Sequence, residues 1–89
     1  MPLRPAGPPP DWILARRRAV GDRIRELRRW RNLTQKRLGD KAGNDRKAMN
    51  RIELGHHSPG LDTLIRIADA LDVSLAELVR DVGSPLPPE

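Results

Sequence analysis

The 89-residue chain contains no cysteine, phenylalanine or tyrosine, and its only aromatic residues are Trp12 and Trp30. Without cysteine, disulfides and thiolate–metal sites are excluded, so a small domain has to rely on its apolar core. Two aromatic side chains are too few for a stacking platform that binds single-stranded nucleic acid. No apolar run approaches the roughly 18 residues of a membrane span, and no signal peptide is recognisable. We therefore expect one small cytoplasmic domain without a membrane partner.

Patterns typical of enzymes and metal sites are also missing. The sequence shows no nucleophile motif, phosphate-binding glycine loop or evident carboxylate pair, and Ser58, which follows His57, reads as a loop residue. The adjacent His56 and His57 have no further ligand at metal-binding spacing. We expect no catalytic residue, no cofactor and no metal. The two histidines either form a solvated loop or contact a phosphate.

Charge is distributed unevenly along the chain. Residues 16–51 hold 14 Lys and Arg against four acidic residues, a net charge of +10, whereas residues 52–89 have a net charge of −5. A basic stretch of this density attracts a polyanion, and duplex DNA carries one negative charge per ~1.7 Å of its axis. The alternative is a solvated helix surface. Arg16, Arg17 and Arg18, at the start of this stretch, fit either interpretation.

Proline marks both ends of the chain. Residues 1–10 contain five prolines, and residues 83–89 read GSPLPPE. Proline disrupts helix interiors, so we expect a flexible arm over residues 1–10, a folded domain over residues 11–82 and a flexible tail over residues 83–89.

Five helical segments are predicted between these ends, and none of them shows strand alternation, so the predicted class is all-α. The first follows an N-cap at Asp11 and continues to about Asn32, although Gly21 weakens its middle. The next segments cover residues 34–42, 45–54 and 61–71, separated by a Gly43–Asn44 turn and a proline-containing loop. The last is capped by Ser74, with Glu77 completing a capping box.

Apolar residues at helical spacing predict the inner faces of these segments. They are Val20, Ile24, Leu27, Leu38, Ala42, Ala48, Met49, Ile52, Leu61, Leu64, Ile65, Ala68, Leu71, Leu75, Leu78 and Val79. Trp30 is expected to pack in the core or at its edge. The cluster of Trp12, Ile13 and Leu14 either caps the bundle or contacts a second copy.

The second and third segments are short and separated by about two residues, as in a helix-turn-helix. The outer face of the third carries Arg46, Lys47, Asn50 and Arg51. Arginine can bond guanine O6 and N7, and asparagine can bond adenine N6 and N7.

Three stretches together resemble the Cro/phage-repressor-type helix-turn-helix family, also called the xenobiotic-response-element family. They are VGDRIRELRRWRNLTQKRLGDKAG, DRKAMNRIELG and SPGLDTLIRIADALDVSLAEL, and they cover about two thirds of the chain. The resemblance implies a five-helix, lambda-repressor-like bundle. The sequence departs from the family pattern at Gly39, where alanine is usual. Glycine lowers the helix propensity by ~1 kcal/mol, so we expect a less stable second helix.

The resemblance also implies roles for individual residues. Thr34 and Gln35 correspond to positions that bind backbone phosphates, sometimes with a base contact from the glutamine. Arg28 and Glu53 correspond to an ion pair that connects the first helix to the third. The DNA-binding positions that it implies are Thr34, Gln35, Asp45, Arg46, Lys47, Asn50 and Arg51. For Asp45, an N-cap and a contact with cytosine N4 are the two interpretations.

These features predict a cytoplasmic, nucleoid-associated transcriptional regulator that binds operator DNA as a homodimer. The small controller proteins of restriction–modification systems fit this description. The alternatives are an antitoxin that also binds a toxin protein, and an adaptor that binds only proteins. For the dimer contact, one candidate is an apolar edge formed by Leu75, Leu78, Val79 and Val82, and the other is the cluster at residues 12–14.

The domain limits lead to a first prediction. Because the arm and the tail are too rich in proline to pack, a shortened chain of residues 11–82 should keep the helical content and the melting temperature of the full chain. Circular dichroism of both proteins measures this. A marked loss of either property would show that one of the ends packs on the domain.

Overall fold

The computed structural model describes residues 7–80, and within this range it has five helices and no strand. They are α1 (Asp11–Trp30), α2 (Gln35–Ala42), α3 (Arg46–Glu53), α4 (Leu61–Ala70) and α5 (Leu75–Val79). The predicted all-α class is confirmed. Residues 1–6 of the predicted arm, the predicted tail, and Val82 at the predicted domain limit lie outside the described residues.

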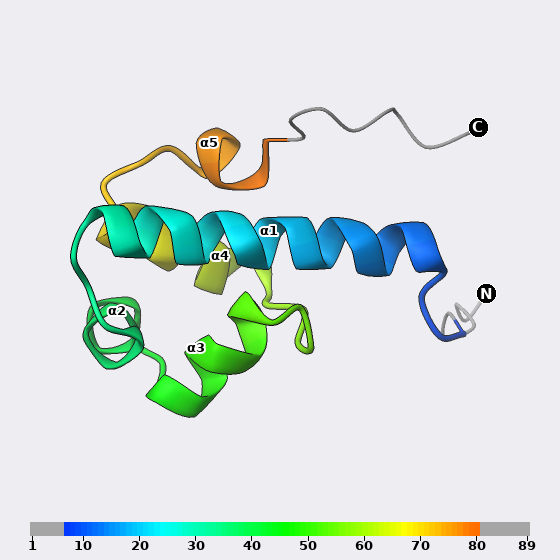
Figure 1. Ribbon diagram of the computed structural model, residues 1–89, viewed down its shortest axis with the longest axis horizontal. Coiled ribbons are helices and arrows are strands. Elements are labelled where there is room, and N and C mark those ends of the chain that lie inside the picture. Colours follow the sequence, from blue (N-terminus) through cyan, green and yellow to red (C-terminus); the bar gives the residue numbers. More distant parts are fainter. Residues whose placement is uncertain (1–6, 81–89) are drawn as a thin grey trace.

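The long helix α1 organises the bundle. α5 packs along one side of α1 and α3 along the other, while α2 contacts both α3 and α4 (Figure 1). α1 begins one residue before the predicted start, with Pro10 rather than Asp11 at the N-cap position. Within residues 7–80, none of the helices is long and apolar enough to cross a bilayer.

α1 is continuous through Gly21, where the sequence suggested a weak point. Gly21 is buried, and a Cβ atom there would lie only 2.5 Å from the carbonyl oxygens of Ile52 and Glu53. The missing side chain therefore lets the backbone of α1 contact the end of α3. This close approach explains a glycine in a helix interior, where it costs about 1 kcal/mol of helix propensity.

Each of the first four helices is followed by a residue in the left-handed conformation, which stops it sharply. These residues are Asn32 (φ 57°), Gly43 (φ 77°), Gly55 (φ 75°) and Asp72 (φ 58°). After α1, for example, the Leu33 N–H donates to the Arg28 carbonyl over 3.0 Å. Such tight ends keep the connections short and hold α2 and α3 close to α1.

The core lies where α1, α2, α3 and α4 meet, with α5 closing one side. Its fully or nearly buried apolar residues are Ile24, Leu38, Ala42, Met49, Ile52, Ile67, Ala68, Leu71 and Leu78. The prediction was wrong for one face of α4, because Leu61 and Ile65 are 61% and 47% exposed, while Ile67 is buried. Helical spacing permits two overlapping apolar stripes here, and α4 buries the stripe that runs through Leu64 and Ile67.

Two further residues lie on the outside, contrary to prediction. Trp30 is 80% exposed, because at about 100° per residue it lies roughly a third of a turn from the stripe of α1 that faces the core. Val79 is 42% exposed, whereas its neighbour Leu78 is fully buried. The carboxylate of Glu77 pairs with Arg23 of α1, so only the Ser74 half of the predicted capping box caps α5.

The close approach at Gly21 gives a second prediction. Gly21→Ala should destabilise the chain by about 1–3 kcal/mol, since the added methyl forces α1 away from α3 and this outweighs the gain in helix propensity. Urea denaturation measures the change. The exposed Ala19→Gly is the control, and it should cost about 1 kcal/mol through propensity alone. A stabilised Gly21→Ala protein would contradict the close packing.

Candidate nucleic-acid interface

The helix pair α2–α3 is fixed at both N-termini by side-chain caps. The Thr34 hydroxyl accepts a 3.0 Å hydrogen bond from the Arg37 N–H, and the Asp45 carboxylate accepts a 2.7 Å bond from the Ala48 N–H. Asp45 thus occupies the N-cap position of α3. The Thr34 hydroxyl hydrogen is still able to donate, for example to a phosphate oxygen.

Gly39 has a structural role beyond its effect on helix propensity. It is buried, and a Cβ atom there would lie 2.3 Å from the carbonyl oxygen of Asn44. The Asn44 N–H donates to the Gly39 carbonyl over 2.8 Å. The glycine therefore lets the turn between α2 and α3 fold back tightly on α2, which sets the position of α3.

A buried ion pair connects α1 to α3. Arg28 Nε lies 2.7 Å from Glu53 Oε2, and Arg28 Nη2 lies 3.0 Å from Glu53 Oε1. Arg28 Nη1 also donates to the Leu33 carbonyl over 2.8 Å. Glu53 is 1% exposed and Arg28 9%. The guanidinium thus binds the last residue of α3 and the connection between α1 and α2 at once, which places the whole helix pair relative to α1.

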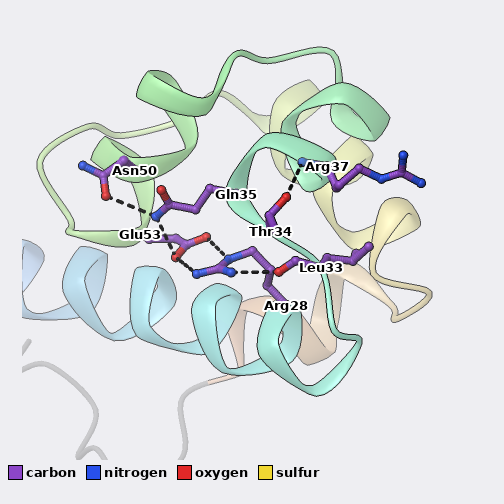
Figure 2. A network of polar contacts seen from close by, with 7 residues as sticks. All are labelled: Arg28, Leu33, Thr34, Gln35, Arg37, Asn50 and Glu53. Atoms are coloured by element: carbon purple, nitrogen blue, oxygen red, sulfur yellow. Dashed lines mark hydrogen bonds and ion pairs between the residues drawn. The ribbon is translucent and has the colours of Figure 1, made fainter.

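This pair continues to the protein surface through two amides, as Figure 2 shows. Gln35 Nε2 lies 3.3 Å from Glu53 Oε1 and 3.1 Å from Asn50 Oδ1. Glu53 is buried, Gln35 half-buried and Asn50 exposed. The sequence resemblance implied the Arg28–Glu53 pair but missed its extension. Gln35 lies 15 positions before Asn50 and 18 before Glu53 in the sequence, and no local pattern connects residues so far apart.

The outward side of α3 is basic and polar. Arg46, Lys47, Asn50 and Arg51 are all exposed, whereas Met49 and Ile52 enter the core. Four residues line one shallow hollow on this surface, namely Gln35, Arg46, Lys47 and Asn50. The structure therefore brings Gln35 of α2 together with three of the predicted base-reading positions. Their contacts with DNA remain predictions.

The loop that follows α3 runs against α1. A Cβ atom on Gly55 would lie 3.0 Å from Arg18 Cα, so the loop passes directly over the backbone of α1. His56 and His57 are exposed in this loop, which is consistent with both interpretations of these histidines. Arg18 and His56 line a hollow beside the end of α3.

Comparison with known proteins places this helix pair in a family. A family model described as helix-turn-helix matches residues 24–78, from the middle of α1 into α5. The chain belongs to the Cro/C1-type helix-turn-helix family. The resemblance found in the sequence is confirmed. Solved structures with similar sequences share this fold.

Two solved structures and two curated relatives illustrate the similarity. The restriction–modification controller protein C.AhdI from Aeromonas hydrophila is 34% identical, with a TM-score of 0.71 over 73% of this chain and 94% of that one. A hypothetical transcription factor, NHTF from Neisseria, is 25% identical, with a TM-score of 0.69 over 84% of each chain. The immunity repressor protein of Bacillus phage phi105 is 38% identical over 62 residues, covering 70% of this chain and 43% of the repressor. The uncharacterized HTH-type transcriptional regulator YqaE of Bacillus subtilis is 39% identical over 59 residues, which are 66% of this chain and 51% of that regulator. The chain spans about half the length of these two curated relatives.

The buried ion pair gives a third prediction. Arg28→Ala leaves the Glu53 carboxylate buried without its partner, and breaking such a pair costs about 3–5 kcal/mol of folding free energy. Thermal and urea denaturation measure this loss.

Arg25→Ala is the matched control. Arg25 pairs with Asp22 over 2.8 Å on the same helix, but its side chain is 36% exposed. An exposed pair contributes only about 0.2–1 kcal/mol. If the two variants melted alike, Arg28 would not be the brace that the geometry indicates.

Proposed function

We propose that the chain is a transcriptional regulator that binds specific sites on duplex DNA by inserting α3 into the major groove. The observation that carries this proposal is the exposed row of Arg46, Lys47, Asn50 and Arg51 on the second helix of a helix-turn-helix. An α-helix with its side chains is about 10–12 Å in diameter, and the major groove is ~12 Å wide. The helix and the groove therefore match in size.

The remaining predicted residues fit supporting roles at the edge of the groove. Thr34 caps α2, and helix N-termini are favourable sites for phosphate. The Asp45 carboxylate caps α3, so any bond to a cytosine N4 amine would add to the cap rather than replace it. The relatives that carry names are regulators and repressors, which supports a binding role rather than catalysis.

We further propose that the regulator binds its operator as a homodimer. The two apolar surfaces that the sequence offered for this contact lie next to each other, because Ile13 and Val79 line the same cavity of about 230 Å³ with Leu64. Val79 is 42% exposed at this cavity, and Trp12 and Leu14, the sequence neighbours of Ile13, are 46% and 41% exposed. Leu78 is fully buried and contributes nothing to this surface. The antitoxin alternative remains an untested prediction.

Direct readout by Arg46 is the fourth prediction. Arg46→Ala should cost ~1–3 kcal/mol on the preferred site and relax the preference at one base position, because an arginine bonds guanine with two donors. Binding constants on the preferred duplex and on a random one measure the effect. Arg29→Ala removes the same charge from an exposed position on α1 and should leave the ratio of the two constants unchanged. If Arg46→Ala lost the same affinity for both duplexes, Arg46 would contact only phosphate.

The homodimer gives the fifth prediction. Two copies should bind one palindromic duplex whose half-sites lie about one helical turn apart, ~34 Å. Val79→Asp should reduce this to one copy at the same concentration, since a charge is then buried in an apolar contact. Analytical ultracentrifugation with the duplex measures the stoichiometry. Trp30→Asp is the control. It places the same charge on another exposed apolar residue, at the far end of α1, and should leave two copies bound. One copy of the unmodified chain at saturation would rule out the dimer.

A further inference from the structure

The Gln35 amide is held in one orientation by its two acceptors. A carboxylate oxygen accepts hydrogen bonds and has no proton to donate when ionised, so Glu53 Oε1 requires the nitrogen of Gln35 to face it. The Glu53 carboxylate is itself fixed by two bonds from Arg28. The buried ion pair therefore decides which end of the Gln35 amide is the nitrogen.

The orientation of the Asn50 amide follows from that of Gln35. An amide nitrogen carries two hydrogens, and Gln35 Nε2 directs one to Glu53 and the other to Asn50 Oδ1. Gln35 Nε2 thus has no hydrogen left for DNA, and Asn50 has to present its oxygen to Gln35. The groups that remain for a ligand are the Asn50 Nδ2 hydrogens, the second lone pair of Asn50 Oδ1 and the Gln35 oxygen. Figure 2 shows the Asn50 nitrogen and the Gln35 oxygen directed away from the shared contact.

This arrangement has a defined complement among the base edges of the major groove. Adenine presents an acceptor, N7, beside a donor, the N6 amine, whereas guanine presents two acceptors, N7 and O6. The Asn50 nitrogen can donate to adenine N7 while an oxygen of the pair accepts from adenine N6. Against guanine, the same oxygen would face O6, and two acceptors repel each other.

We propose that Gln35 and Asn50 act as one preoriented unit that reads an adenine and rejects guanine, with its polarity set by Glu53. This inference rests on the proposed function and deepens it. It assigns Gln35 to base discrimination through Asn50, whereas the sequence resemblance implied a phosphate contact, in some relatives together with a base contact from the glutamine itself. It also makes the buried pair a positioning device for recognition, in addition to its structural role.

The experiment begins by selecting duplexes from a random pool with the full chain. Each base pair of the enriched duplex is then replaced in turn, and the dissociation constants of the unmodified chain, Gln35→Ala, Asn50→Ala and the double variant are measured. The proposal predicts one A·T pair in the enriched site at which both single variants lose discrimination. There, the preference for A·T over the replaced base pairs should fall about tenfold to a hundredfold in each variant. The double variant should lose no more than either single one.

The outcomes separate the two claims. If the unmodified chain enriches no duplex, the proposed function fails. If it enriches one, but the two variants relax different base pairs, add their effects or relax none, the shared reading unit is wrong.

A second variant keeps the test valid if Gln35→Ala unfolds. Asn50→Asp retains an oxygen for Gln35 but replaces the donor that faces adenine N7 by an acceptor. The preference for adenine at that position should therefore shift to a base without N7, such as cytosine, whose N4 amine donates. Asn44→Asp adds the same charge at the turn between α2 and α3 and should weaken all duplexes alike. Retained adenine preference in Asn50→Asp would overturn the proposal.

Discussion

The bidentate bond between Arg28 and Glu53 determines how the rest of the molecule is arranged. It joins α1 to the end of α3, and a third donor of Arg28 holds the Leu33 carbonyl in the connection between α1 and α2. Removing two charges from water costs several kcal/mol, so the net contribution of such a pair to stability is small. Its geometric value here is that one guanidinium sets the position of both helices of the pair. The exposed side of α3 has its orientation because of this buried contact.

Backbone proximity accompanies this polar brace. Gly21 lets α1 touch the carbonyls that end α3, and Gly39 lets the turn before α3 fold against α2. Both glycines give up helix propensity for contacts that no side chain would permit. α3 is therefore held at its end by Gly21 and Glu53 and at its beginning by Gly39 and the Asp45 cap. Contacts at both ends fix the orientation of α3, as the proposed insertion of several of its side chains into one groove requires.

Local chemistry made much of this predictable from the sequence. Caps at Thr34, Asp45 and Ser74 and the turn glycines located the helices closely, and the family resemblance supplied the fold. The prediction failed where two choices were locally equal. α4 could bury either of two apolar stripes. Trp30 follows Leu27 by three positions, which predicted an inward side chain, but its helical phase relative to Ile24 and Arg28 points outward. The Gln35–Asn50 contact joins separate helices, so only the three-dimensional structure reveals it.

The most direct test of this account is a titration of the isotopically labelled chain with a duplex that it selects from a random pool, followed by the backbone amide resonances. We expect the largest shifts at residues 34–35 and 45–51, together with a shift of the Gln35 side-chain amide, while Ile67 and the rest of the inner side of α4 stay unchanged. Unperturbed resonances in residues 45–51, with shifts concentrated on the exposed side of α4, would contradict the claim that α3 is the DNA-reading element.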